Sequence, residues 1–145
     1  MGYRSDVAYI IRVKTIKAKE FIALAKLKGL GGALDECTVE AEGNEVDFSF
    51  YAGGVKWYES YEDVQMHEAL LQFVGDEFNE HAGYRFIRIG EDDEDVDTKI
   101  GGSDSLDPWE NFYISREIHI PFSILNKPSD VTVRLDSLIG DNNDD

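Results

Sequence analysis

The chain has 145 residues and a net charge of −16, from 30 Asp and Glu against 14 Lys and Arg. Its length fits one domain with its own core, and a hydrophobic content of 42% excludes a compositionally disordered protein. Nucleic acids and anionic membranes are disfavoured as ligands, because they repel an acidic surface. The single cysteine, Cys37, cannot form an intrachain disulfide and favours a reducing, cytoplasmic location.

The first 30 residues predict a strand followed by a helix. Residues 7–13 are rich in β-branched and aromatic side chains, which is typical of a buried strand. In residues 16–30 apolar side chains recur at three- and four-residue steps, as on one face of a helix, and the glycines within 29–32 would end it. Residues 1–28 hold seven basic and two acidic side chains, so the excess of negative charge lies in the rest of the chain.

A β-hairpin is expected from residue 38 onward, where the hydrophobic period changes to two. The turn pair at 43–44 separates two alternating segments, and the glycines at 53–54 would end the second. One face of this hairpin is apolar and the other acidic, an alternation that antiparallel sheets tolerate. The acidic face consists of Glu40, Glu42, Glu45 and Asp47.

A second helix is expected from Ser60, a typical N-cap residue, to about His81. Trp57 lies just before this helix, where it either anchors a partner or covers the start of the helix. Residues 84–89 predict a further strand, and residues 91–107 are expected to form an acidic loop.

The last third of the chain predicts strands over 112–122 and 131–135 and a disordered acidic tail over 141–145. The order of strands and helices indicates an α+β fold. We expect a split βαβ-like arrangement, with an antiparallel or mixed sheet and two helices packed on one face. Residues 1–140 are expected to form a single domain.

No catalytic motif is present, so we expect neither an enzyme nor a cofactor. Asp93, Asp95 and Asp97 match positions 1, 3 and 5 of a calcium-binding loop, with Asp104 at position 12. The pattern departs at position 6, which is threonine instead of glycine, and at position 12, which is not glutamate. Cation binding by the 91–104 loop is therefore a weaker alternative to a solvated acidic loop.

Three segments carry a resemblance: MGYRSDV at 1–7, KWY at 56–58 and FIRIGED at 86–92. Together they resemble small uncharacterised proteins of bacteriophages and prophages. The resemblance implies an origin and attaches no activity or functional residue to the chain. Small acidic phage proteins often antagonise the nucleic-acid machinery of the host, so the resemblance implies a basic surface of a host protein as the partner.

The charge then predicts a protein that binds and inhibits or modulates a host nucleic-acid-binding protein. Rows of carboxylates would mimic the charge of DNA and occupy a groove lined by Lys and Arg. The alternative is a general protein–protein interaction module whose acidity serves only solubility. The candidate partner-binding residues are Glu40, Glu42, Glu45, Asp47, Glu91, Asp92, Asp93, Glu94, Asp95, Asp97 and Trp57. Mimicry requires that these carboxylates share one continuous face.

Overall fold

The computed structural model describes residues 2–111, 131 and 135. In this part of the chain no helix is long and apolar enough to cross a membrane. In chain order the elements are β1 (Ser5–Lys14), the 3-10 turn η1 (Thr15–Lys17), α1 (Ala18–Leu27), α2 (Gly31–Asp35), β2 (Thr38–Glu42), β3 (Glu45–Val55), α3 (Glu62–Glu77), β4 (Ala82–Ile89), β5 (Val96–Gly102), η2 (Asp104–Leu106) and η3 (Trp109–Asn111).

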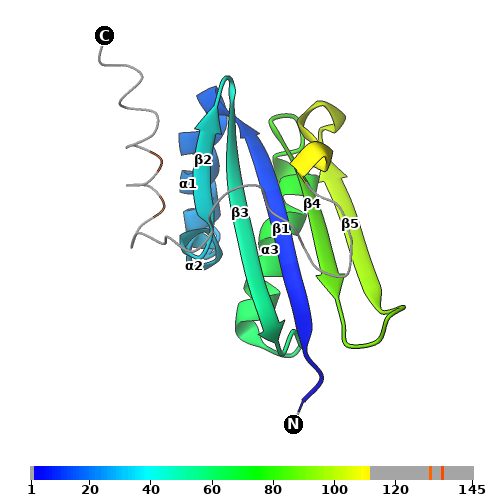
Figure 1. The fold of residues 1–145 in the computed structure, drawn as a ribbon. Coiled ribbons are helices and arrows are strands. Elements are labelled where there is room, and N and C mark those ends of the chain that lie inside the picture. The colour runs from blue at the N-terminus through cyan, green and yellow to red at the C-terminus, as the bar shows by residue number, and fades with distance from the viewer. Residues whose placement is uncertain (1, 112–130, 132–134, 136–145) are drawn as a thin grey trace.

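The strands form one sheet in the order β2-β3-β1-β4-β5, and every neighbouring pair is antiparallel (Figure 1). β3 lies between β1 and β2, and β1 lies between β3 and β4. The helical connections β1-α1-β2 and β3-α3-β4 therefore each join parallel strands with a third strand between them, which is the split βαβ arrangement. The predicted α+β class is confirmed, and β5 extends this arrangement by one edge strand.

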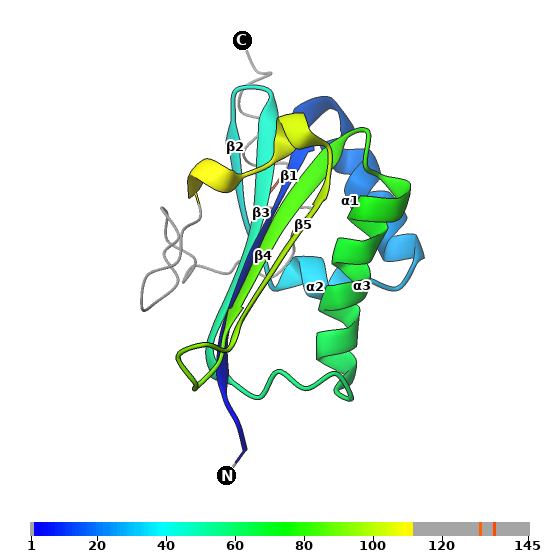
Figure 2. The same cartoon turned by 90° about the vertical axis from the view of Figure 1, so that its right-hand side faces the viewer.

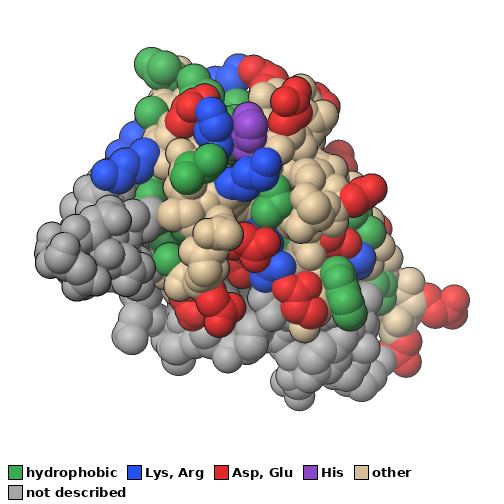
Figure 3. Space-filling view, turned by 90° about the horizontal axis from the view of Figure 1, so that it is seen from above, with side chains coloured by type: hydrophobic (Ala, Val, Ile, Leu, Met, Phe, Trp, Pro, Cys, Tyr) green, Lys and Arg blue, Asp and Glu red, His purple; other side chains and the backbone are tan. Residues whose placement is uncertain are grey.

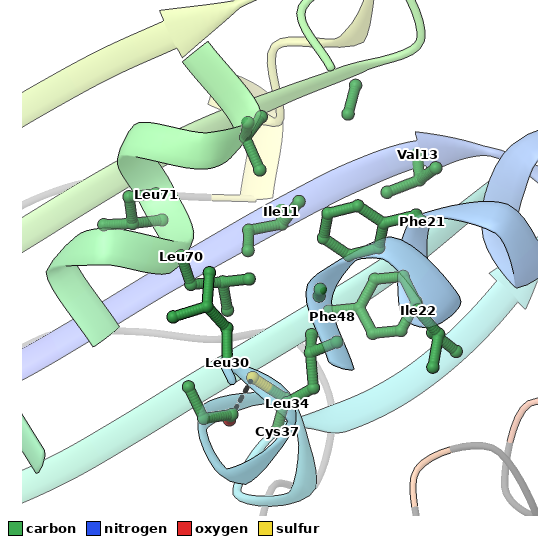
Figure 4. Close-up of a cluster of buried hydrophobic side chains, with 14 of the residues drawn as sticks. Ile11, Val13, Phe21, Ile22, Leu30, Leu34, Cys37, Phe48, Leu70 and Leu71 are labelled. Atoms are coloured by element: carbon green, nitrogen blue, oxygen red, sulfur yellow. Dashed lines mark hydrogen bonds between the residues drawn. The ribbon is translucent and has the colours of Figure 1, made fainter. Parts of the chain in front are cut away.

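The helices α1, α2 and α3 cover the same face of the sheet, as the side view shows (Figure 2). Alternate residues of a strand point to the same face, so β1 presents Val7, Tyr9, Ile11 and Val13 to the helices. These four side chains are fully buried. Figure 4 shows Ile11 and Val13 beneath side chains of α1, α2 and α3.

Phe21 of α1 lies at the centre of this core. Its ring centroid is 5.3 Å from that of Phe48 on β3, 5.8 Å from Phe73 on α3 and 5.4 Å from Phe78 just beyond α3. Such distances are typical of favourable aromatic pairs. The ring of Phe21 therefore joins α1 to both β3 and α3.

The other face of the sheet is partly covered as well. Ala8 and Ile10 of β1 and Ile87 of β4 form a small buried apolar cluster there. The segment η2–η3 crosses this face, since Arg85 of β4 binds Asp107 through two hydrogen bonds of 2.6 and 2.9 Å. The central strand β1 is consequently buried on both sides.

The glycines of the first half act only partly as predicted. Gly29 ends α1 as expected, with φ of +79° and a hydrogen bond from Leu30 N–H to the Ala25 carbonyl. The helix predicted over 16–30 is therefore only Ala18–Leu27, preceded by η1, and Gly31 begins α2. The glycines at 53–54 do not end β3, because they form an irregular pairing with β1 and the strand continues to Val55.

The second half brings further corrections. The expected loop over 91–107 contains β5 and η2, and α3 begins after Tyr61 rather than Ser60, without a side-chain cap. The strand expected over 112–122 and the tail over 141–145 lie outside the described residues. A further strand was expected over 131–135, where the structure describes Val131 and Leu135. Both residues are helical and buried, so the prediction of a strand is wrong at these two positions.

Replacing Phe21 by alanine should destabilise the fold by about 3–5 kcal/mol, because the lost ring leaves a cavity among three other aromatic rings. Urea denaturation followed by circular dichroism measures the change. Ile16→Ala is the control, since Ile16 is 87% exposed and its truncation should change stability by less than about 0.5 kcal/mol. Equal losses for the two variants would contradict this account of the core.

Candidate functional site

The hairpin carboxylates, defined as Glu40, Glu42, Glu45 and Asp47, share one face of the sheet. Glu40 pairs with Asp47 across β2 and β3, and Glu42 pairs with Glu45. Directly opposite residues of antiparallel strands place their side chains on the same face, about 5 Å apart. Arg12 of β1 is opposite Asp47 and continues the row. This is the face that the helices leave uncovered.

Arg12 binds three of the carboxylates near it. Its Nε donates to Oδ1 of Asp47 at 2.8 Å and its Nη2 to Oδ2 at 3.0 Å, a bidentate pair. Nη1 donates to a carboxylate oxygen of Glu110 on η3, and Oε1 of Glu45 lies 3.5 Å from Nε. The hydrogen bond with Asp47 is the main cause that raises the pKa of Arg12 far above its usual value. Arg12 therefore neutralises Asp47 and ties η3 to the sheet.

Glu40 and Glu42 have no such compensation. Glu40 is half-buried and Glu42 is exposed, and no Lys or Arg in the described part of the chain forms an ion pair with either. Burial raises the pKa of Glu40, and the negative charges of Asp47 and Glu42 raise this pKa further. A carboxylate whose ionised form is disfavoured in this way is stabilised by an approaching cation. The pair is thus suited to bind a positively charged group.

A hollow of about 420 Å³ adjoins the hairpin carboxylates at the turn between β2 and β3. Asn44 and Glu45 line one side, and Ile16 and Leu106 supply apolar surface. Figure 3 looks onto this end of the molecule and shows Lys, Arg, Asp and Glu side chains interspersed among hydrophobic ones. An apolar hollow with a charged rim is the arrangement found at many protein-binding surfaces.

The β4–β5 carboxylates, Glu91, Asp92, Asp93, Glu94, Asp95 and Asp97, behave differently. Arg88 Nη2 donates to Oδ1 of Asp95 at 2.6 Å and to Oδ2 of Asp97 at 2.8 Å. The Tyr3 hydroxyl donates to Asp95 at 2.6 Å, and the pKa of Asp95 is lowered by Arg88 first and by Tyr3 second. Glu91 accepts a 2.6 Å hydrogen bond from the Arg4 backbone N–H. Much of this acidic group therefore fixes the N-terminal segment to the β4–β5 turn.

The two acidic groups lie at opposite ends of the sheet. On β1, Lys14 is opposite Glu45, whereas Asp6, eight residues earlier, is opposite Ile89 at the end of β4. Eight residues of extended strand span roughly 26 Å. The groups also differ in face, because Asp97 pairs with Arg88, which pairs with Val7 of the helix-covered face. The predicted carboxylates thus do not form one continuous row among the described residues.

The calcium-like spacing does not form an ion site in the described part of the chain. No group of three His, Cys, Asp or Glu side chains lies close enough there to hold a metal ion. Asp95 and Asp97 both point to Arg88, and the segment that would have to wrap around an ion is the strand β5. The cation-binding alternative therefore gains no geometric support.

Trp57 packs against the core beside α3. It is half-buried, and its ring centroid lies 6.0 Å from Phe50, 5.7 Å from His67 and 6.4 Å from Phe86. Its indole Nε1 is buried and has no hydrogen-bond partner among the described residues. Of the two interpretations of this residue, the geometry favours a cover over the core rather than an exposed anchor.

A buried polar network was missed by the sequence reasoning. Nδ1 of His67 lies 2.6 Å from the Tyr9 hydroxyl, and Nε2 lies 3.1 Å from Oε1 of Glu36. The sulfur of Cys37 lies 3.7 Å from the same hydroxyl. The helical period offered a signal, since His67 follows Val64 by three residues and so lies on the buried face of α3. The network links β1 and α3 to the segment just after α2, and it runs from the core at Tyr9 to the exposed carboxylate of Glu36.

Glu40→Gln should stabilise the protein near pH 7 by about 0.5 kcal/mol, the scale of one cross-strand pair of like charges. The pKa of Glu40 is raised in the fold, so the folded state binds this proton more tightly, and wild-type stability falls as pH rises through the raised pKa. The gain should vanish near pH 3, where Glu40 is protonated. Urea titrations at both pH values measure it, with Glu94→Gln as an exposed control; a gain independent of pH would contradict the electrostatic cause.

Comparisons with known proteins do not help to interpret this geometry. Neither a protein-family model, nor a curated protein, nor a solved structure matches the chain. The function is therefore argued from the arrangement of its own residues.

Proposed function

We propose that this chain is a cytoplasmic binding protein that docks onto a basic surface of another protein. The observation that carries the proposal is the uncompensated pair Glu40 and Glu42, next to an Asp47 that Arg12 already neutralises. An arriving Arg or Lys offsets the burial and the repulsion that together raise the pKa of Glu40, and it forms strong charge-assisted hydrogen bonds. The binding energy therefore comes from charges left unpaired in the free protein.

The adjoining hollow supports a protein as the partner. Ile16, which is 87% exposed, offers an apolar contact in the hollow that Glu45 and Lys14 also line, so a side chain with an apolar body and a charged end can contact both Ile16 and Glu45. Arginine has this character and is enriched at protein interfaces. The net charge of −16 also attracts a basic protein from a distance and speeds the encounter.

The partner that we propose is a nucleic-acid-binding protein of a bacterial host, which the chain inhibits or modulates by occupying its basic groove. A groove that receives phosphates presents the Arg and Lys side chains that Glu40 and Glu42 can accept. Because the β4–β5 carboxylates lie at the other end of the sheet, the contact that we propose is local to the hairpin. Charge mimicry would then act at a few positions of the groove rather than along its whole length.

The test uses the immobilised protein to capture partners from a bacterial lysate at about 50 mM and about 500 mM salt. Three baits are compared: wild type, the double variant Glu40→Gln/Glu42→Gln, and the control Asp92→Asn/Glu94→Gln. The control removes the same charge from exposed positions at the opposite end of the sheet. The captured protein is then titrated against a fluorescent DNA duplex, with each bait as competitor.

Wild type and control should displace the duplex equally, and the hairpin double variant should compete about tenfold less well. Competition should also weaken steeply with salt. Equal losses for both variants would show that only net charge matters and would reject the hairpin site. Capture that persists at high salt, by a protein without affinity for nucleic acid, would replace the proposal by a general interaction module.

A further inference from the structure

We propose that the edge strand β5 pairs antiparallel with β5 of a second copy of this chain, so that the two sheets become one. The pairing is centred on Thr98, which faces the Thr98 of the second copy across a two-fold axis. This interaction surface is separate from the hairpin carboxylates, which lie beside the opposite edge of the sheet. Three observations carry the proposal: an exposed edge, the phase of its backbone groups and a self-complementary sequence.

Among the described residues, the outer edge of β5 is open. The described part of the chain pairs β5 with β4 and with no other strand. The strand is exposed from Val96 to Ile100, and Ile100, at 58% exposure, is among the most exposed large apolar side chains of the protein. An exposed edge with unpaired backbone groups is a template for another strand.

The backbone of β5 directs alternate residues toward this edge. At its two ends, Gly90 N–H donates to the Asp95 carbonyl at 2.8 Å and Ser103 N–H donates to the Ala82 carbonyl at 2.9 Å. Both are directly opposite pairs, so the odd-numbered residues of β5 bond to β4 in this antiparallel ladder. The even-numbered residues, Thr98 among them, therefore point their N–H and C=O groups outward.

Centring on Thr98 uses those outward groups. The N–H and C=O of Thr98 meet the same groups of the second copy, and each Ile100 N–H meets the carbonyl of Val96 across the axis. The Val96 carbonyl points outward, whereas its N–H is already bonded to the Glu94 carbonyl at 3.1 Å. The register thus pairs both backbone groups of Thr98, the Ile100 N–H and the Val96 carbonyl without disturbing an existing bond, and it leaves the Ile100 carbonyl to solvent.

The sequence of β5 is complementary to itself when two copies run in opposite directions. The strand begins Val-Asp-Thr-Lys-Ile over 96–100. Antiparallel pairing about Thr98 places Asp97 opposite Lys99 on the helix-covered face and Val96 opposite Ile100 on the other face. Each of these pairs occurs twice, as a two-fold contact requires. Opposite charges and apolar side chains are the favourable cross-strand pairs of a sheet.

Other registers and the other edge are less favourable. Centring on Asp97 or on Lys99 would place each of these charges opposite itself, which is destabilising. At the far edge, β2 carries Glu40 and Glu42 and no basic residue, so self-pairing about Ala41 or Glu40 would face glutamate with glutamate. Charged edges of this kind block strand addition. The second copy consequently docks on β5.

The first experiment measures mass by sedimentation equilibrium from about 1 to about 200 μM protein. The wild type should form dimers within this range. Thr98→Pro removes an outward N–H but no bond to β4, so it should fold normally and weaken the dimer about tenfold or more. Leu27→Ser on α1 is the control, because Leu27 is 83% exposed and α1 lies behind β2, at the opposite edge of the sheet from β5 (Figure 1). It should leave the dimer unchanged.

The second experiment tests the register by charge. Asp97→Lys places like charges in both pairs, and so does Lys99→Asp, so each variant alone should be monomeric. An equimolar mixture of the two variants restores opposite charges at both pairs and should form a heterodimer. Asp97→Lys also removes the internal ion pair with Arg88, and Lys99→Asp removes the one with Glu68. Circular dichroism therefore verifies the fold of each variant.

Several results would overturn the proposal. A wild type that remains monomeric throughout the range would do so, as would a dimer that survives Thr98→Pro or dissociates in Leu27→Ser. If Thr98→Pro does not fold, the mixture decides: two folded variants that do not combine would reject this register. A dimer in either single charge variant would reject it equally.

Discussion

The burial of β1 on both faces is the constraint on which the rest of the structure depends. One face lies under the helices, and the other carries Ala8 and Ile10 in a second small cluster. Arg12 is the charged residue enclosed within this strand, at 8% exposure. A charge in such a place must be paired, because leaving it alone out of water is costly. Asp47 and Glu110 supply the partners, so the position of the acidic hairpin and of η3 follows from one arginine in the central strand.

The same principle separates two kinds of carboxylate in a chain that is acidic throughout. Asp95, held by Arg88 and Tyr3, has a lowered pKa, whereas Glu40, half-buried between other carboxylates, has a raised one. A carboxylate of the first kind is paired with partners inside the protein and so holds segments of the fold together. The second kind forms no ion pair with a Lys or Arg in the described part of the chain. Net charge alone does not distinguish the two, and the positions of the arginines do.

The sequence predicts well where local periodicity is strong and poorly where a partner lies far along the chain. The alternation in the hairpin and the helical stripe of α3 led to the correct α+β class. The strand β5 was missed because Asp97, Thr98 and Lys99 are exposed polar residues of an edge strand, with little burial to impose a pattern. The ion pair between Arg12 and Asp47 joins residues 35 positions apart, and no local sequence pattern predicts it. The sequence therefore predicted part of the geometry of the candidate site. It placed the hairpin carboxylates on the face of the sheet away from the helices, but the predicted continuous row with the β4–β5 carboxylates does not form among the described residues.

The opposite placement of β2 and β5 has a consequence for avidity. Joining two sheets through β5 leaves the two acidic hairpins at the outermost edges, roughly 43 Å apart across the strands at their usual spacing and at opposite ends along the strand direction. The two-fold axis of an antiparallel strand pair runs perpendicular to the sheet, so both hairpins would lie on the same face of the joined sheet, whose twist turns them in different directions. A partner with two basic sites at that separation, or two copies of a partner side by side on a polymer, could be held at both ends at once. The second contact would then form at the high effective concentration set by a rigid spacer.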